Sequence, residues 1–89
     1  MSDGTAALQE RVTRLVAQVI LAMTGRSVMP APDDALFEDY LDPVDMTALL
    51  LALDEEFGVT LAVHEANPRT LRSVASITEL LGRLRRKRS

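Results

Sequence analysis

The stretch that decides the fold is residues 42–58, which read DPVDMTALLLALDEEFG. Asp42 is a strong helix N-cap, because its carboxylate accepts hydrogen bonds from the free amides of a first turn. Pro43 suits the next position, since its missing N–H would be unpaired there anyway. Asp45 adds negative charge at the positive end of the helix dipole, and Gly58 tolerates the left-handed backbone that ends many helices. The stretch therefore predicts a helix that begins at Asp42-Pro43 and ends at Gly58.

Apolar residues recur at three- and four-residue steps in three segments, which is the spacing of a helix with one buried face. The first segment carries Leu8, Val12, Leu15, Val16, Val19, Ile20 and Met23, with Gly25 at the C-cap position. The second carries Val44, Leu49, Leu50, Leu53 and Phe57. The third has Ser73 as its N-cap, carries Val74, Ile77, Leu80, Leu81 and Leu84, and is expected to fray at residues 85–88.

The segment between the first two helices, residues 26–41, is predicted to be a long loop, because Pro30 and Pro32 interrupt regular structure. Phe37 and Leu41 are apolar within this polar stretch. An unanchored loop of this length is unusual in a compact domain. We therefore expect both side chains to pin the loop onto the core.

The remaining connection is predicted as an extended connector over residues 59–63 and one helical turn over residues 64–67. The expected architecture is one all-α domain over residues 1–89, with a core at about 5–84 and a basic tail at 85–89. It is a small helical bundle of three main helices and a short third helical turn, with a long loop between helices 1 and 2.

Composition excludes several classes of site. The 89 residues contain no cysteine and one histidine, which excludes a disulfide scaffold and a cysteine- or multi-histidine-ligated metal. Two phenylalanines and one tyrosine are too few for a base-stacking surface. No nucleophile, base and orienting group stand in a recognisable pattern, so we expect a protein that is not an enzyme and holds no metal.

The net charge of −3 is the sum of three unlike segments. Residues 1–26 have a net charge of +1, residues 27–68 hold ten acids and no Lys or Arg, and residues 69–89 have a net charge of +6. An acidic block of this length argues against nucleic acid as the main partner and favours a protein with a basic surface. The basic tail is read as a soluble helix end, with contact to anionic membrane or nucleic acid as the alternative.

A family resemblance is carried by two quoted stretches, LFEDYLDPVDM at 36–46 and LLLALDEEFGV at 49–59. They resemble acyl carrier proteins, in which a Phe-Glu-Asp-Leu-like anchor precedes Gly-x-Asp-Ser-Leu-Asp-Leu and the second helix ends in acidic-acidic-Phe-Gly-Ile. The resemblance covers about residues 8–84. It implies a carrier-like helical bundle whose second helix docks on basic patches of partner enzymes.

The resemblance also implies a serine that carries 4′-phosphopantetheine at the start of the second helix. Pro43 occupies that position, and a gapless alignment puts Val44 there instead; neither has a hydroxyl. The loop before it is about one residue shorter than in the family and lacks its glycine. Thr47 and Ser27 are the nearest hydroxyls. We therefore predict no cofactor, with 4′-phosphopantetheine implied only if another residue carries it.

Two functional hypotheses follow. In the first, this is a non-standard carrier-like protein that docks on a synthase, transferase or ligase, or on an assembly partner, through Asp42, Val44, Asp45, Met46, Glu55 and Glu56. In the second, it is a working acyl or aminoacyl carrier of fatty-acid, polyketide or related biosynthesis with an atypical attachment. The alternative interpretation of the acidic residues is that they form a solvent-exposed helix face without a partner. The alternative for Val44 and Met46 is that they belong to the hydrophobic core.

The sequence shows no targeting or membrane-spanning segment. The N-terminus shows no basic region followed by an apolar run, so no signal peptide is predicted. The longest apolar run is residues 48–53, too short to span a bilayer. We expect a cytoplasmic monomer.

Overall fold

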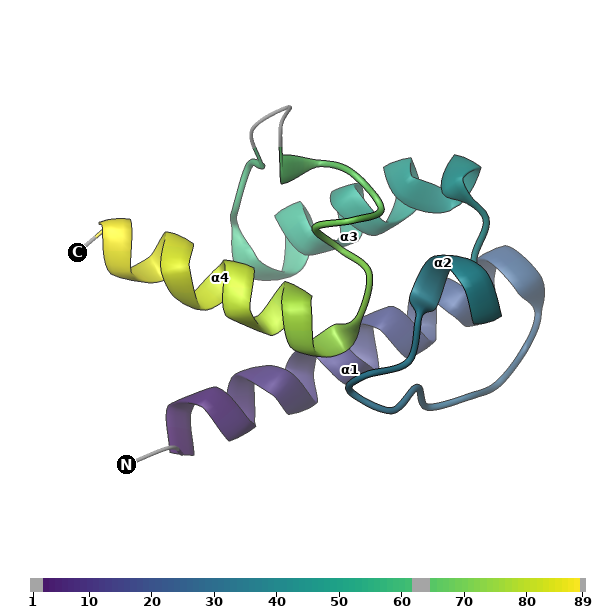
Figure 1. Cartoon of the computed structure of the whole chain (residues 1–89), viewed down its shortest axis with the longest axis horizontal. Helices are drawn as coiled ribbons and strands as arrows, with labels where there is room; N and C mark the ends of the chain where they lie inside the picture. The colour runs from purple at the N-terminus through teal and green to yellow at the C-terminus, as the bar shows by residue number, and fades with distance from the viewer. Residues whose placement is uncertain (1–2, 62–64, 89) are drawn as a thin grey trace.

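The computed structural model describes residues 3–61 and 65–88, and over these ranges the regular secondary structure is helical, without a strand. The elements are α1 (Asp3–Thr24), α2 (Leu36–Asp39), the 3₁₀ turn η1 (Pro43–Asp45), α3 (Met46–Phe57) and α4 (Val74–Arg88). Helix α1 packs against both α3 and α4, and α2 lies at the end of the molecule where α3 begins (Figure 1). The predicted small helical bundle is confirmed.

One cluster of buried apolar side chains forms the core. Its members come from all four α-helices and from the connections between them. They are Leu8, Val12, Leu15, Val16, Val19, Ile20, Leu36, Leu41, Leu49, Leu53, Val59, Leu71, Val74, Ile77, Leu80 and Leu81. Met23 of the first apolar face and Val44 of the second were predicted to join them and do not, since their side chains are 46% and 81% exposed. The first helix therefore buries a narrower stripe than its apolar spacing indicates.

The predicted glycine caps are confirmed at both helix ends. Gly25 has φ 77° and its N–H donates to the carbonyl of Leu21 at 2.9 Å. Gly58 has φ 65° and its N–H donates to the carbonyl of Asp54 at 2.8 Å. A side chain at such positive φ values is strained, which is why glycine ends these helices.

The connection between α1 and α3 differs from the predicted irregular loop, because it contains the short helix α2. Leu41 is buried and Phe37 packs partly buried against the core, as predicted, but the deepest anchor is Leu36, which is fully buried. Two long-range backbone bonds hold the segment to the start of α4: the Leu36 N–H donates to the Arg72 carbonyl at 2.7 Å, and the Ala75 N–H to the Pro32 carbonyl at 2.9 Å. The second bond also satisfies a free amide in the first turn of α4.

Hydrogen bonds of the Asp34 carboxylate also stabilise the connection between α1 and α3. Oδ2 of Asp34 accepts the N–H of Ala31 at 2.8 Å and the hydroxyl of Tyr40 at 2.8 Å. These bonds favour the charged carboxylate and lower the pKa of Asp34, chiefly through the Ala31 amide. The same pairing raises the pKa of Tyr40. Arg26 closes over this turn, with its guanidinium 5.3 Å from the Tyr40 ring centre.

The start of α4 follows the prediction and its end does not. The Ser76 N–H donates to Oγ of Ser73 at 3.1 Å, which confirms Ser73 as the N-cap. The helix continues through Arg88, so the expected fraying of residues 85–88 is wrong. Lys and Arg are good helix formers and their charge suits a helix C-terminus. Of the preceding connection, residues 62–64 lie outside the described part, so the predicted turn at 64–67 falls partly outside it.

Candidate docking site on α3

The start of α3 is built by two carboxylates in a capping box. The backbone N–H of Asp42 donates to Oδ2 of Asp45 at 3.0 Å, and in return the side chain of Asp42 accepts from the backbone of Asp45. Pro43 stands at the first position, where no N–H is needed. The predicted N-cap is confirmed, although the first turn is 3₁₀. Because its carboxylate bonds the backbone, Asp45 has a structural task.

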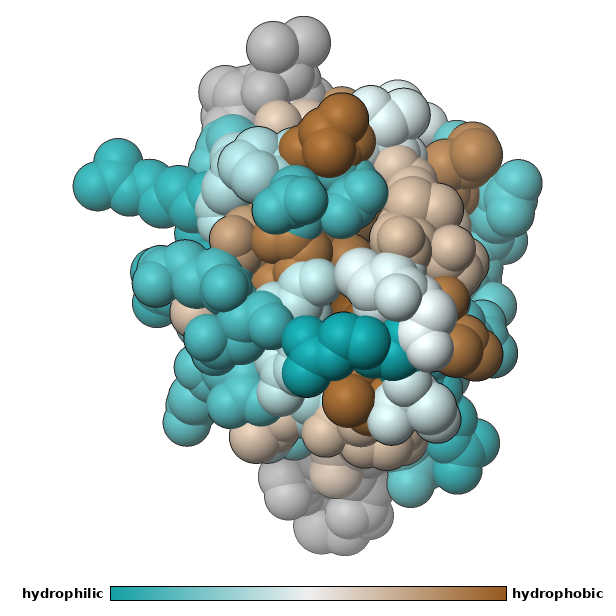
Figure 2. Space-filling model, turned by 90° about the vertical axis from the view of Figure 1, so that its right-hand side faces the viewer, coloured by the Kyte–Doolittle hydropathy of each residue, from teal (hydrophilic) through white to brown (hydrophobic). Residues whose placement is uncertain are grey.

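The outward face of α3 carries exposed apolar side chains. Val44 is 81% exposed and Leu51 is 57% exposed. Val44 belongs to the turn η1 that leads into α3, and with partly buried Ala48 and exposed Glu55 the two residues follow the spacing i, i+4, i+7 and i+11, which places the four on about the same side. We call these four residues the α3 ridge. Figure 2 faces the end where α2 and the start of α3 lie, and shows hydrophobic surface emerging between polar residues.

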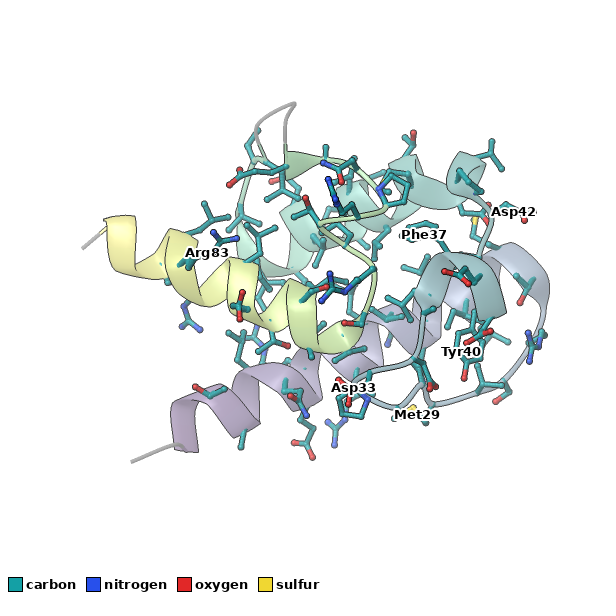
Figure 3. All side chains as sticks on the ribbon, viewed as in Figure 1. Met29, Asp33, Phe37, Tyr40, Asp42 and Arg83 are labelled. Atoms are coloured by element: carbon teal, nitrogen blue, oxygen red, sulfur yellow. The ribbon has the colours of Figure 1, made fainter. Side chains whose placement is uncertain are left out.

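Acidic side chains stand at both ends of the α3 ridge, and one of them, Glu55, is its last member. Asp42 is exposed before its start, and Asp54 and Glu55 are exposed near its end. Asp42 lies at the end of the molecule opposite Arg83 of α4 (Figure 3). The segment of residues 27–68 contains no Lys or Arg of its own, and the ion pair at this end of α3 joins Arg11 of α1 to Glu56. The ridge thus combines an apolar centre with a negative border.

The six predicted docking residues fall into two groups. Asp42, Val44 and Glu55 are exposed, and the last two belong to the α3 ridge. Met46 packs partly buried against the core, so it does not stand among the exposed apolar side chains, and its role in docking stays a prediction. Asp45 is bonded at the helix start, and Glu56 is paired with Arg11.

Leu51 is the surface residue that the sequence reading missed. It stands within the run Leu49-Leu50-Leu51, which looks uniformly apolar. The available signal was the seven-residue step from Val44 to Leu51, which puts both on the side opposite buried Leu53. Its exposure strengthens the candidate site, because large exposed apolar side chains mark interaction surfaces when they gather in one place.

Two shallow grooves adjoin α1. One, of about 300 Å³, runs between α1 and α3 and is lined by Leu15, Gln18, Val19, Ala22, Met23, Ala48, Ala52, Glu55 and Glu56. We call it the α1–α3 groove. The other, of about 340 Å³, lies between α1 and the following loop and is lined by Arg14, Ala17, Gln18, Leu21, Ser27, Val28 and Met29. Only the first shares residues with the α3 ridge.

The start of α3 does not fit a phosphopantetheine attachment. Pro43 and Val44 are both exposed there, and neither side chain has a nucleophile that could bond the phosphate. The first hydroxyl on this helix is that of Thr47, which is also exposed. No step through the prosthetic group follows from Pro43 or Val44.

Other kinds of site are equally unsupported by the described residues. Over residues 3–61 and 65–88, no group of three or more His, Cys, Asp or Glu side chains is placed to hold a metal ion. Within the same ranges no helix has the length and apolar character needed to cross a bilayer. Acid pairs such as Asp33 and Asp34 therefore have no metal-binding arrangement.

Comparisons with protein-family models, with curated proteins and with solved structures give no match to this chain. The resemblance to acyl carrier proteins therefore depends on the motif residues of the sequence itself. Its functional content enters below as a proposal.

Proposed function

We propose that this protein is a carrier-like interaction module that docks on a partner protein through the α3 ridge and carries no covalently attached cargo. The supporting observation is the exposure of Val44 and Leu51 on one helix face, bordered by exposed carboxylates. Burying large apolar side chains at the centre of an interface supplies most of its binding free energy. The acidic border selects a partner whose surface is basic.

The resemblance to acyl carrier proteins supplies the class of partner. In that family the second main helix meets synthases, transferases and ligases at basic patches. Here the ridge keeps the acidic and apolar character while the attachment serine is replaced. This combination best supports a role in binding an enzyme that handles carrier proteins, or in an assembly that uses a carrier-like subunit. We propose that it acts as a monomer and not on nucleic acid.

Affinity capture with paired variants tests the docking role. The double variant Val44→Glu/Leu51→Glu places charge on both apolar contacts of the ridge and should abolish capture of the native partner from cells that make the protein. Its matched control is Leu21→Glu/Met29→Glu, which alters two residues that are 50% and 65% exposed in the other groove region. Equal capture by both variants would overturn the docking role of the ridge.

Charge reversal tests the acidic border and needs a careful choice of residues. Asp42→Lys combined with Asp54→Lys and Glu55→Lys changes exposed carboxylates and should weaken partner capture most at low salt. Asp45 and Glu56 are left intact, because changing them would also disturb the helix start and the link to Arg11. Unchanged capture across the salt range would remove the acids from the interface.

The alternative, a working acyl or aminoacyl carrier, is favoured by one observation: Thr47 presents an exposed hydroxyl one turn after Pro43. Incubation with a broad-specificity phosphopantetheinyl transferase and coenzyme A, followed by intact-mass measurement, separates the two functions. We expect no mass gain in the native protein. A stoichiometric gain that Thr47→Val removes would establish the carrier function and overturn the cargo-free proposal.

A further inference from the structure

The α1–α3 groove has apolar side chains at its base and small side chains along its α3 side. Leu15 and Val19 of α1 are buried beneath it. On the α3 side it is bounded by Ala48 and Ala52, which are four residues apart and so lie one turn above the other on the same side of the helix. A larger side chain at either position would occupy part of the groove. The two alanines therefore keep the space between the helices open.

The apolar surface and the negative charge of the α3 ridge both continue into this groove. Ala48 belongs to the ridge and to the groove, and Met23 adds a 46% exposed apolar side chain from α1. Glu55 and Glu56 stand at the end of the groove. Glu56 is paired with Arg11, whereas Glu55 is an exposed carboxylate in a segment without Lys or Arg. An apolar groove thus ends in negative charge.

The size and openness of the groove suit a protein side chain better than a free metabolite. Its volume of about 300 Å³ is at the bottom of the range of roughly 300–1,000 Å³ for small-molecule sites, and it is a shallow surface feature. Amphipathic helices dock into apolar grooves of this kind with anchors at i, i+3 or i+4, and i+7. The carboxylates at its end complement a Lys or Arg near those anchors.

We propose that the α1–α3 groove receives an apolar anchor of a basic amphipathic helix of the partner, whose Lys or Arg meets Glu55 while the helix lies along the α3 ridge. This inference rests on the proposed function and adds the chemistry of the partner. The groove beside residues 27–29 is not the site, because its charged border is Arg14 and it contains no carboxylate.

A designed peptide probes the groove directly. The probe is a synthetic helix with Leu at every third or fourth position and Lys on the flanking positions, titrated into the isotopically labelled full chain. Amide shifts should concentrate at Ala22, Met23, Ala48 and Ala52. A peptide of equal charge with Ala in place of Leu should bind at least about tenfold more weakly. Equal binding of both peptides, or shifts centred on Leu21 and Met29, would overturn the proposal.

Matched substitutions separate the two grooves. Ala52→Gln fills the α1–α3 groove and should weaken Leu-peptide binding at least about tenfold. Ala17→Gln makes the same change in a partly buried helical alanine of the other groove and should leave binding unchanged. Unaltered unfolding midpoints show that both variants fold. Equal effects of the two substitutions would contradict the assignment.

Two further outcomes distinguish this inference from the proposed function. If Val44→Glu/Leu51→Glu abolishes capture of the native partner and Ala52→Gln does not, the groove is not used and the docking ridge stands. If only the peptide results hold, the groove binds basic helices while the ridge is not the native interface. A concentration-dependent dimer that Ala52→Gln dissociates would give the groove to a second copy, whose α4 is basic, and would overturn the partner-helix proposal.

Discussion

The guanidinium of Arg11 donates to Oε2 of Glu56 at 3.0 Å across 45 positions of sequence. The same guanidinium lies 4.7 Å from the ring centre of Phe57. One side chain of α1 therefore holds the last turn of α3 through both an ion pair and a cation–π contact. Because α1 and α3 bound the candidate groove, this pair also fixes the end of that groove.

A double-mutant cycle on Arg11→Ala and Glu56→Gln should give a coupling free energy of about 0.2–1 kcal/mol, the usual range for an exposed pair. Arg11→Ala should cost roughly 0.5–1 kcal/mol more than Glu56→Gln, because it also removes the contact with Phe57. Urea unfolding at low and high salt measures both. The pair Arg14–Glu10, at 3.8 Å within α1, is the control and should couple more weakly. Equal coupling of the two pairs would contradict the prediction.

Gly58→Ala should lower the free energy of unfolding by about 1 kcal/mol, because φ is 65° and a Cβ is strained there. Space is not the cause, since nothing lies within 4 Å of an added Cβ. Gly4→Ala is the control of opposite sign: it lies in α1, also without a neighbour within 4 Å, and should raise stability by a few tenths of a kcal/mol. Thermal or urea unfolding of both variants measures these changes. A higher free energy of unfolding in Gly58→Ala than in the native protein would refute the prediction.

Asp34→Asn should reduce stability at neutral pH and alter its acid dependence. The folded pKa of Asp34 is lowered below 3.8, so its contribution is complete above about pH 3.8 and is lost as pH falls through the folded pKa. The difference between native protein and variant should therefore shrink in acid. The pKa of Tyr40 is raised above 10, so the contribution of its protonated form is complete below pH 10 and declines as pH rises through the folded pKa.

Urea midpoints from pH 2 to pH 7 measure the Asp34 effect. Asp33→Asn, in the neighbouring exposed residue, is the control and should leave the midpoint nearly unchanged. A difference between native protein and Asp34→Asn that stays constant down to pH 2 would show that the Ala31 and Tyr40 bonds do not depend on the charge of the carboxylate.

Leu36→Ala should cost about 2–5 kcal/mol, since this fully buried side chain is the anchor of α2. Leu51→Ala is the same substitution at a 57% exposed position and should change stability by less than about 0.5 kcal/mol. Chemical denaturation of the two variants compares them directly. Similar losses would mean that the exposure of Leu51, and with it the α3 ridge, is misassigned.

Several residues of the candidate site could be predicted from the sequence. The others could not, because their exposure depends on the side chains that pack against them in the folded structure. Asp42, Val44 and Glu55 were expected at the site because they lie in the acidic stretch that resembles the second helix of acyl carrier proteins. For Met46 the sequence left open an exposed contact or a core position, and only the packing shows that its side chain is partly buried against the core. Leu51 was missed because a continuous run of leucines gives no sign of which one faces solvent. In the connection, Leu36 was overlooked because α2 is too short for helical periodicity to show.

The sequence by itself determined the caps that start the second and third main helices and the glycines that end the first and second. The Asp42 and Ser73 caps and the Gly25 and Gly58 ends work through bonds within a few residues, so their residue types suffice. The tertiary structure decided what the helices expose. The Arg11–Glu56 pair, the exposure of Met23 and Leu51, and the groove between Met23 and Ala52 all depend on how α1 packs against α3. That packing joins residues tens of positions apart, which no local pattern encodes.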